Sequence, residues 1–79
     1  MLDPTFMSIL TRHLRYLDGE LTPDASLRAL GLDSMASVAL MVDLEDAFGV
    51  TLPDRLVTME TFANAGTLWQ AISGARSAN

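Results

Sequence analysis

The chain has 79 residues, 49% of them apolar, and ten Asp and Glu residues against five Arg give it a formal net charge of −5. This length accommodates one domain. A nucleic-acid-binding protein is not expected, because no basic patch is available to replace phosphate counterions. The absence of Cys excludes disulfide bonds, zinc sites of the finger type and thiol nucleophiles.

The amino-terminal residues do not resemble a signal peptide, because they lack a basic start and include Asp3 and Pro4. No apolar stretch approaches the length needed to span a membrane. We therefore expect a cytoplasmic protein that binds no membrane. An acidic surface suits basic protein partners, although the same charge can simply keep a small domain in solution.

Asp3-Pro4 predicts the start of a first helix, with Asp as the capping residue and Pro at the first helical position. The helix is expected to end by Asp18-Gly19. Residues at helical spacing give it one apolar face: Phe6, Ile9, Leu10, His13, Leu14 and Leu17.

Residues 18–33 form a long connection for so small a chain, and long ordered loops are more often functional than idle. Thr22-Pro23 could begin a short turn of helix. Three leucines could hold the segment against the core: Leu27, Leu30 and Leu32.

A second helix is expected to begin at Asp33-Ser34 and to run to Ala47 or Phe48, where Gly49 stops it. Its composition predicts two apolar stripes. The first should enter the core and contains Leu40, Met41, Leu44 and Phe48. The second lies further around the helix and is followed by two acids: Met35, Val38, Ala39 and Val42, then Glu45 and Asp46.

One helix of a small bundle cannot easily be buried all round, so the second stripe is predicted to be partly exposed. An exposed apolar line flanked by acids is typical of a docking surface for other proteins. The alternative is that this stripe covers loop residues such as Leu27 and Leu30.

Residues 51–54, TLPD, interrupt the helical pattern, and Arg55 to Met59 could form one short helix. Thr61 is expected to cap a last helix that Gly74 closes. Its predicted stripe contains Phe62, Ala65, Trp69 and Ile72. The sequence thus predicts an all-α fold, a small four-helix bundle of three main helices and a short third one, with a domain over residues 1–73 and a flexible tail over 74–79.

Residues 30–35, LGLDSM, resemble the L-G-x-D-S-[LM] signature of acyl and peptidyl carrier proteins. Residues 38–50, VALMVDLEDAFGV, are similar to the second helix of that family, including its L-E-x-x-F-G end. Residues 51–54 resemble its linker into a short third helix. The resemblance extends from about Phe6 to Ile72 and implies the acyl-carrier fold.

The resemblance implies that the hydroxyl of Ser34 receives a 4′-phosphopantetheine group from coenzyme A. A serine at a helix start lies near unpaired backbone N–H groups, and a phosphodiester there would sit in the favourable field of the helix N-terminus. Gly31 would let the loop turn tightly before it. A simple helix cap also explains a serine at this position, but not the constellation around it.

By the same resemblance, Asp33 helps the phosphopantetheinyl transferase and its Mg²⁺ to engage the carrier. The second stripe and its acids would contact partner enzymes, namely acyltransferases, adenylating enzymes or ketosynthase-type enzymes: Met35, Val38, Ala39, Val42, Glu45 and Asp46. The protein would be a monomer that carries an acyl or aminoacyl thioester, and no metal site of its own is expected. The cargo could rest in a cleft near Leu40, Leu56 and Trp69, by analogy of fold.

The sequence departs from many fatty-acid carriers, which have acids where this chain has Ala36 and Ala39. This departure favours a carrier of polyketide or related secondary-metabolite biosynthesis over one of general fatty-acid synthesis. The D-S-M context favours an acyl or polyketide cargo slightly over an amino acid. The length suggests a free-standing protein, with an excised domain as the alternative.

An enzyme is not expected, because the only His is His13, 21 residues before Ser34, and the chain has no Lys or Cys to activate a nucleophile. Two other possibilities remain open at this point. One is an unmodified helical adaptor that only docks partners, and the other is a degenerate carrier with a structural role.

Overall fold

The computed structural model describes residues 3–17 and 19–78, with side chains described as far as residue 76. Within these residues the chain forms three α-helices, α1 (Pro4–Arg12), α2 (Ser34–Phe48) and α3 (Ala65–Ala78), and a 3-10 helix, η1 (Asp54–Leu56). These residues form no strand, and their β-pairing is an isolated bridge between Ser26 and Asn64. The all-helical prediction is confirmed, whereas the expected fourth helix is a single 3-10 turn.

The start of α1 is confirmed, because Asp3 Oδ1 accepts the N–H groups of Thr5 and Phe6 at 2.8 and 3.1 Å. The predicted extension of this helix towards residue 17 is wrong, since α1 ends at Arg12. The chain leaves the helix because the N–H of Tyr16 donates to the carbonyl of Leu30 at 3.0 Å, a partner in the long loop. The predicted stop at Asp18 lies outside the described residues.

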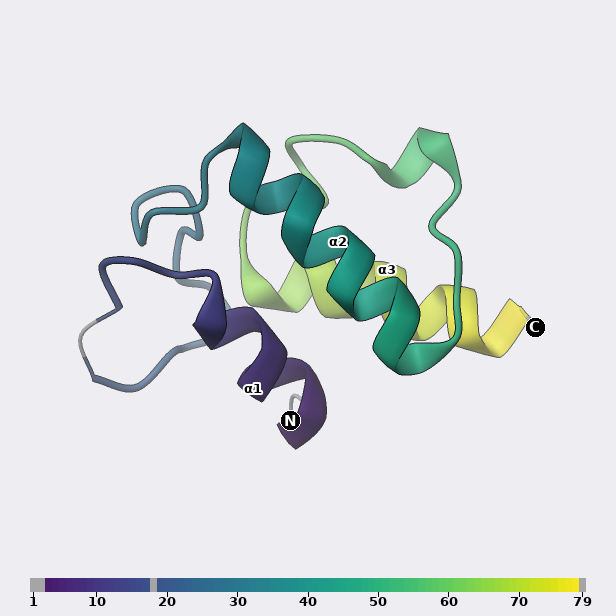
Figure 1. Ribbon diagram of the computed structural model, residues 1–79, viewed down its shortest axis with the longest axis horizontal. Coiled ribbons are helices and arrows are strands. Elements are labelled where there is room, and N and C mark those ends of the chain that lie inside the picture. Colours follow the sequence, from purple (N-terminus) through teal and green to yellow (C-terminus); the bar gives the residue numbers. More distant parts are fainter. Residues whose placement is uncertain (1–2, 18, 79) are drawn as a thin grey trace.

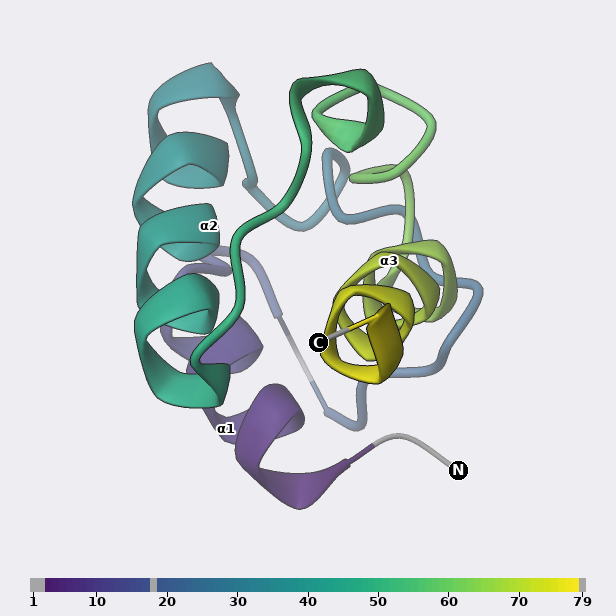
Figure 2. The same ribbon diagram turned by 90° about the vertical axis from the view of Figure 1, so that its right-hand side faces the viewer.

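The core lies where the three α-helices and the long loop meet (Figures 1 and 2). Trp69 on α3 joins them, with its ring centroid 5.1 Å from that of Phe6 on α1 and 5.7 Å from that of Phe48 on α2. The largest fully buried side chains are Phe6, Leu10, Leu27, Leu40, Leu44, Leu68 and Ile72. Burial of such side chains contributes about 1.5–3 kcal/mol each before conformational entropy is counted.

The helix predicted over residues 55–59 is wrong in extent, because the 3-10 turn ends at Leu56. After this turn a side chain pairs with the backbone, because the hydroxyl oxygen of Thr58 accepts the N–H of Thr61 at 3.1 Å. The segment then returns past the amino-terminal end of α2 before α3 begins (Figure 1).

Thr61 does not cap the last helix. Asn64 stands before α3, and its Oδ1 accepts the N–H of Thr67 at 2.8 Å. The start is delayed because residues 63 and 64 pair with the long loop, the carbonyl of Ala63 accepting the N–H of Leu27 at 3.0 Å. Gly74 does not end α3, which continues to Ala78, and the domain boundary at residue 73 stays a prediction.

No helix in the described ranges, 3–17 and 19–78, is long and apolar enough to cross a membrane.

Candidate functional site

Ser34 is the first residue of α2, and its side chain is exposed. The helix cap is Asp33, whose Oδ1 accepts the N–H of Ala36 at 2.8 Å. The backbone carbonyl of Asp33 accepts the N–H and the hydroxyl of Ser37, each at 2.8 Å. Among the described residues, the Ser34 hydroxyl makes no hydrogen bond. Capping is therefore done by Asp33, and it does not account for a serine at position 34.

The loop before Ser34 is held by backbone hydrogen bonds to other parts of the chain. The N–H of Leu32 donates to the carbonyl of Leu27 at 3.0 Å, and the N–H of Gly66 donates to the carbonyl of Pro23 at 2.9 Å. Leu27 and Leu32 are buried, which confirms that these leucines hold the loop against the core. The position of Ser34 is thus fixed by the anchored loop before it and by α2 after it.

Gly31 has the left-handed backbone of the tight turn that the sequence predicts, and it also makes a close approach that was not predicted. Its φ is +102°, a conformation that side chains rarely adopt. A Cβ atom at this position would lie 2.9 Å from Cβ of Arg15 and 3.1 Å from Cδ2 of Tyr16. Only glycine lets the loop pass this close to the segment that follows α1.

The second stripe of α2 is exposed. The exposed fraction is 84% for Met35, 57% for Val38 and 54% for Val42, and Ala39 is exposed between them. The alternative, in which this stripe covers Leu27 and Leu30, does not hold. We call Met35, Val38, Ala39 and Val42 the apolar line of α2.

The acids near this line differ in their surroundings. Asp46 is exposed, whereas Glu45 is half-buried and its Oε2 accepts the N–H of Leu52 at 2.7 Å. Asp43 Oδ2 lies 2.7 Å from Nε2 of His13, the capping residue after α1, where the imidazole N–H donates. The structure brings Asp46 to the surface with the apolar line, while Glu45 and Asp43 also hold the fold together.

His13 is not placed to activate Ser34. Its partner Asp43 lies nine residues along α2 from Ser34, which is roughly 13 Å along the helix axis. Proton transfer requires hydrogen-bond distance or one bridging water. In the described part of the chain, moreover, no group of three or more His, Cys, Asp or Glu side chains is arranged to hold a metal ion.

A hollow of about 690 Å³ opens beside Ser34. It lies between the end of the α1 segment, the long loop, the start of α2 and the turn before α3. Its lining residues are Arg15, Tyr16, Ser26, Arg28, Gly31, Leu32, Asp33, Ser34, Ser37, Met59, Phe62 and Ala63. Sequence reasoning missed the two arginines and Met59, because nothing in their spacing places them near Ser34.

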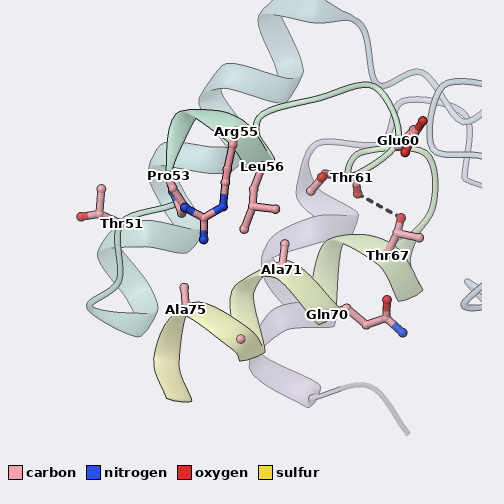
Figure 3. Close-up of a pocket in the computed structure, with 11 residues that line it drawn as sticks. Thr51, Pro53, Arg55, Leu56, Glu60, Thr61, Thr67, Gln70, Ala71 and Ala75 are labelled. Atoms are coloured by element: carbon pink, nitrogen blue, oxygen red, sulfur yellow. Dashed lines mark hydrogen bonds between the residues drawn. The ribbon is translucent and has the colours of Figure 1, made fainter. Parts of the chain in front are cut away.

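A second hollow, of about 700 Å³, lies between residues 51–61 and α3 (Figure 3). Leu56 lines it, and the guanidinium of Arg55 turns towards α3 above Ala75 (Figure 3). The small residues Ala71, Gly74 and Ala75 belong to its α3 wall. The predicted cleft near Leu40, Leu56 and Trp69 is therefore displaced, since Leu40 is fully buried and neither it nor Trp69 lines this space.

Comparison with known proteins identifies the family. Residues 5–72 match the family described as phosphopantetheine attachment site. The aminoacyl carrier protein of Agrobacterium fabrum is 46% identical over 41 residues, 52% of this chain and 49% of that protein. The non-reducing polyketide synthase subA of Metarhizium robertsii is 37% identical over 65 residues, which are 82% of this chain but 3% of the synthase. The chain thus spans about half of one relative and a small part of the other.

A solved structure agrees. The carrier protein in the crystal structure of Bradyrhizobium japonicum glycine:[carrier protein] ligase, complexed with cognate carrier protein and an analogue of glycyl adenylate, superposes with a TM-score of 0.69. It is 33% identical in sequence, and the match covers 89% of this chain and 88% of that one. Given the family match over residues 5–72 and this shared fold, the chain belongs to the phosphopantetheine attachment site family of carrier proteins, whose members hold 4′-phosphopantetheine covalently.

Proposed function

We propose that this protein holds an acyl or aminoacyl group as a thioester on a 4′-phosphopantetheine arm at Ser34 and presents it to partner enzymes. The observation that supports Ser34 most is its isolation at the start of α2. Its hydroxyl is exposed and makes no hydrogen bond with the described residues, while the neighbouring Asp33 caps the helix. A side chain with no structural task at a rigid helix start is suited to modification.

The first turn of α2 fits a phosphodiester. Asp33 already accepts the N–H groups of Ala36 and Ser37. The N–H groups of Ser34 and Met35 have no acceptor among the described residues, and they lie at the positive end of the helix dipole. Both features favour a phosphate on the Ser34 oxygen.

The chemistry at Ser34 is a group transfer. Its Oγ gains a bond to phosphorus as the pyrophosphate bond of coenzyme A breaks, adenosine 3′,5′-bisphosphate leaves, and the hydroxyl proton passes to a base on the transferase. We assign Asp33, exposed beside Ser34, to contact with the phosphopantetheinyl transferase and its Mg²⁺. When attached, the arm supplies the thiol that holds the cargo.

Partner enzymes dock on the apolar line of α2 in this proposal. Met35 and Val42 expose more than half of their surface where burial inside the domain would otherwise be favourable. Asp46 adds a negative charge beside them, and Glu45 contributes mainly by fixing the linker after α2. A docking surface made of so few side chains suits weak, transient docking, which lets one carrier serve several enzymes in turn.

The docking surface is tested by placing a charge on it. Val42→Asp should lower the rate at which a partner enzyme uses the loaded carrier by about tenfold, a loss of roughly 1.4 kcal/mol in binding, and change the free energy of unfolding much less. Ala47→Asp is the matched control, since Ala47 is exposed on the same helix but lies away from the apolar line. Equal losses of turnover in both variants would remove Val42 from the docking surface.

We propose a cargo of amino-acid or polyketide type. The aminoacyl carrier proteins and the polyketide synthases to which the chain is similar support these two classes, and the adenylating and ketosynthase-type partners follow from them. Intact mass of the protein from its producing organism, before and after hydroxylamine, identifies the cargo because hydroxylamine cleaves thioesters. A modified protein that never carries a hydroxylamine-labile group would contradict the carrier role.

A further inference from the structure

Two of the five arginines of this acidic chain lie around Ser34. Arg15 follows α1, Arg28 lies in the long loop, and both line the hollow of about 690 Å³ that Ser34 also lines. Both side chains are exposed. Positive charge is therefore gathered beside Ser34 in a protein whose net charge is −5.

These arginines are not explained by ion pairs inside the domain. Among residues 3–17 and 19–76, no carboxylate oxygen lies within 4.0 Å of either guanidinium, and the ion pair formed there joins His13 to Asp43. Asp33 shares the hollow, but its Oδ1 accepts the N–H of Ala36. The lining of the hollow thus includes two arginines and one carboxylate that is already hydrogen-bonded.

The hollow also has apolar lining residues. Met59 is 78% exposed, and Phe62 is half-buried. One methylene group beyond its phosphate ester oxygen, phosphopantetheine has a carbon that bears two methyl groups, followed by a hydroxyl-bearing carbon and two amides. A hollow lined by Ser34, by two arginines and by Met59 and Phe62 offers partners for both the anion and the apolar group.

We propose that this hollow is a resting cradle for the arm attached to Ser34. Arg15 and Arg28 attract its phosphodiester, and Met59 and Phe62 contact the methyl groups near it. The inference rests on the proposed attachment at Ser34. Its consequence is that a resting arm lies on the side of Ser37, which lines the hollow, and leaves the apolar line of α2 clear for a partner.

The experiment compares the protein before and after modification by nuclear magnetic resonance, with ¹⁵N labelling and the ³¹P signal of the arm. The attached arm should shift the Nε–H signals of Arg15 and Arg28 and the amide signals of Gly31 and Ala63. The shifts should shrink between 20 mM and 500 mM salt, because the Debye length falls from roughly 20 Å to about 4 Å. Unchanged arginine signals at low salt would overturn the cradle.

Charge-removing variants test the two arginines separately. Arg15→Gln and Arg28→Gln should each reduce the ratio of docked to undocked arm roughly two- to fivefold, as expected for one exposed ion pair. Arg12→Gln is the matched control, because Arg12 is exposed on α1 but does not line the hollow. Equal effects of all three variants would contradict the cradle, because they would show that the arm responds only to the net charge of the protein.

The phosphate that Arg15 and Arg28 attract could instead be that of free coenzyme A during the transfer reaction. Titration of coenzyme A into the Ser34→Ala variant separates the two sources. The cradle would be overturned by two results together: coenzyme A binds this variant with a dissociation constant below about 1 mM, and the attached arm causes no shifts in the modified protein. The arginines would then be assigned to binding of coenzyme A. If the arm is not attached at all, the mass of the protein does not increase after incubation with the transferase. A mass increase with an arm that leaves the hollow untouched contradicts the cradle alone.

Discussion

Glu45 Oε2 accepts the backbone N–H of Leu52 at 2.7 Å, and this bond folds the linker after α2 back onto the helix. Gly49 makes the turn possible with a φ of +64°, and the N–H of Val50 donates to the carbonyl of Glu45 at 3.1 Å. Leu52 is buried as a result. An acid that the sequence placed on the docking surface therefore also positions the segment that leads to η1.

Glu45→Ala should lower the free energy of unfolding by about 1–3 kcal/mol, because it removes a hydrogen bond to a charged acceptor and leaves a part-buried N–H unpaired. Asp46→Ala, one residue further along, serves as the control, since Asp46 is exposed. Chemical denaturation of both variants provides the measurement. Equal stabilities of the two variants would show that the bond to Leu52 contributes nothing.

Asp33 and Ser34 should differ sharply in their effect on stability. Asp33→Ala removes the cap of α2 and should cost about 1 kcal/mol. Ser34→Ala removes an exposed hydroxyl with no hydrogen bond among the described residues, and should change the free energy of unfolding by less than about 0.5 kcal/mol. The reverse order in thermal or chemical denaturation would identify Ser34 as the cap instead of Asp33.

Two glycines should respond with opposite signs to replacement by alanine. Gly31→Ala should destabilise the protein by about 1–3 kcal/mol, because the φ of +102° is strained for alanine and the new Cβ would meet Arg15. Gly74→Ala should stabilise it by about 0.5–1 kcal/mol, since Gly74 is inside α3 with open space around it. The melting temperature should fall below that of the original protein in Gly31→Ala and rise above it in Gly74→Ala.

His13, which caps the end of α1, contacts Asp43 on α2, and a double-mutant cycle can isolate the energy of this contact. The side chain of Asp43 is 50% exposed, so solvent screening limits the coupling between the two residues to about 0.2–1 kcal/mol. The variants are His13→Ala, Asp43→Ala and the pair, each measured by denaturation at neutral pH. Strictly additive losses would mean that the 2.7 Å contact has no net energetic effect.

The elements fixed by local chemistry were predictable. α2 begins and ends as its sequence indicates, because the Asp33 cap and the left-handed Gly49 act within one turn. Its two stripes were also correctly separated, since the helical period alone decides that Leu40 and Leu44 enter the core while Met35 and Val38 do not.

The elements fixed by distant partners were not predictable. α1 stops early because Tyr16 pairs with Leu30, and α3 starts late because Ala63 pairs with Leu27. The same holds for the candidate site. A motif located Ser34, but Arg15 and Met59 reach its hollow only through the fold.

The central claim is that Ser34 is the attachment point of the arm. The most direct measurement is the intact mass of the protein and of its Ser34→Ala variant after incubation with a broad-specificity phosphopantetheinyl transferase, Mg²⁺ and coenzyme A. Ser37→Ala serves as a matched control on the same helix. We expect a single increase of about 340 Da in the original protein and in Ser37→Ala, and no increase in Ser34→Ala. An unchanged mass of the original protein, or an increase that persists in Ser34→Ala, would contradict the claim.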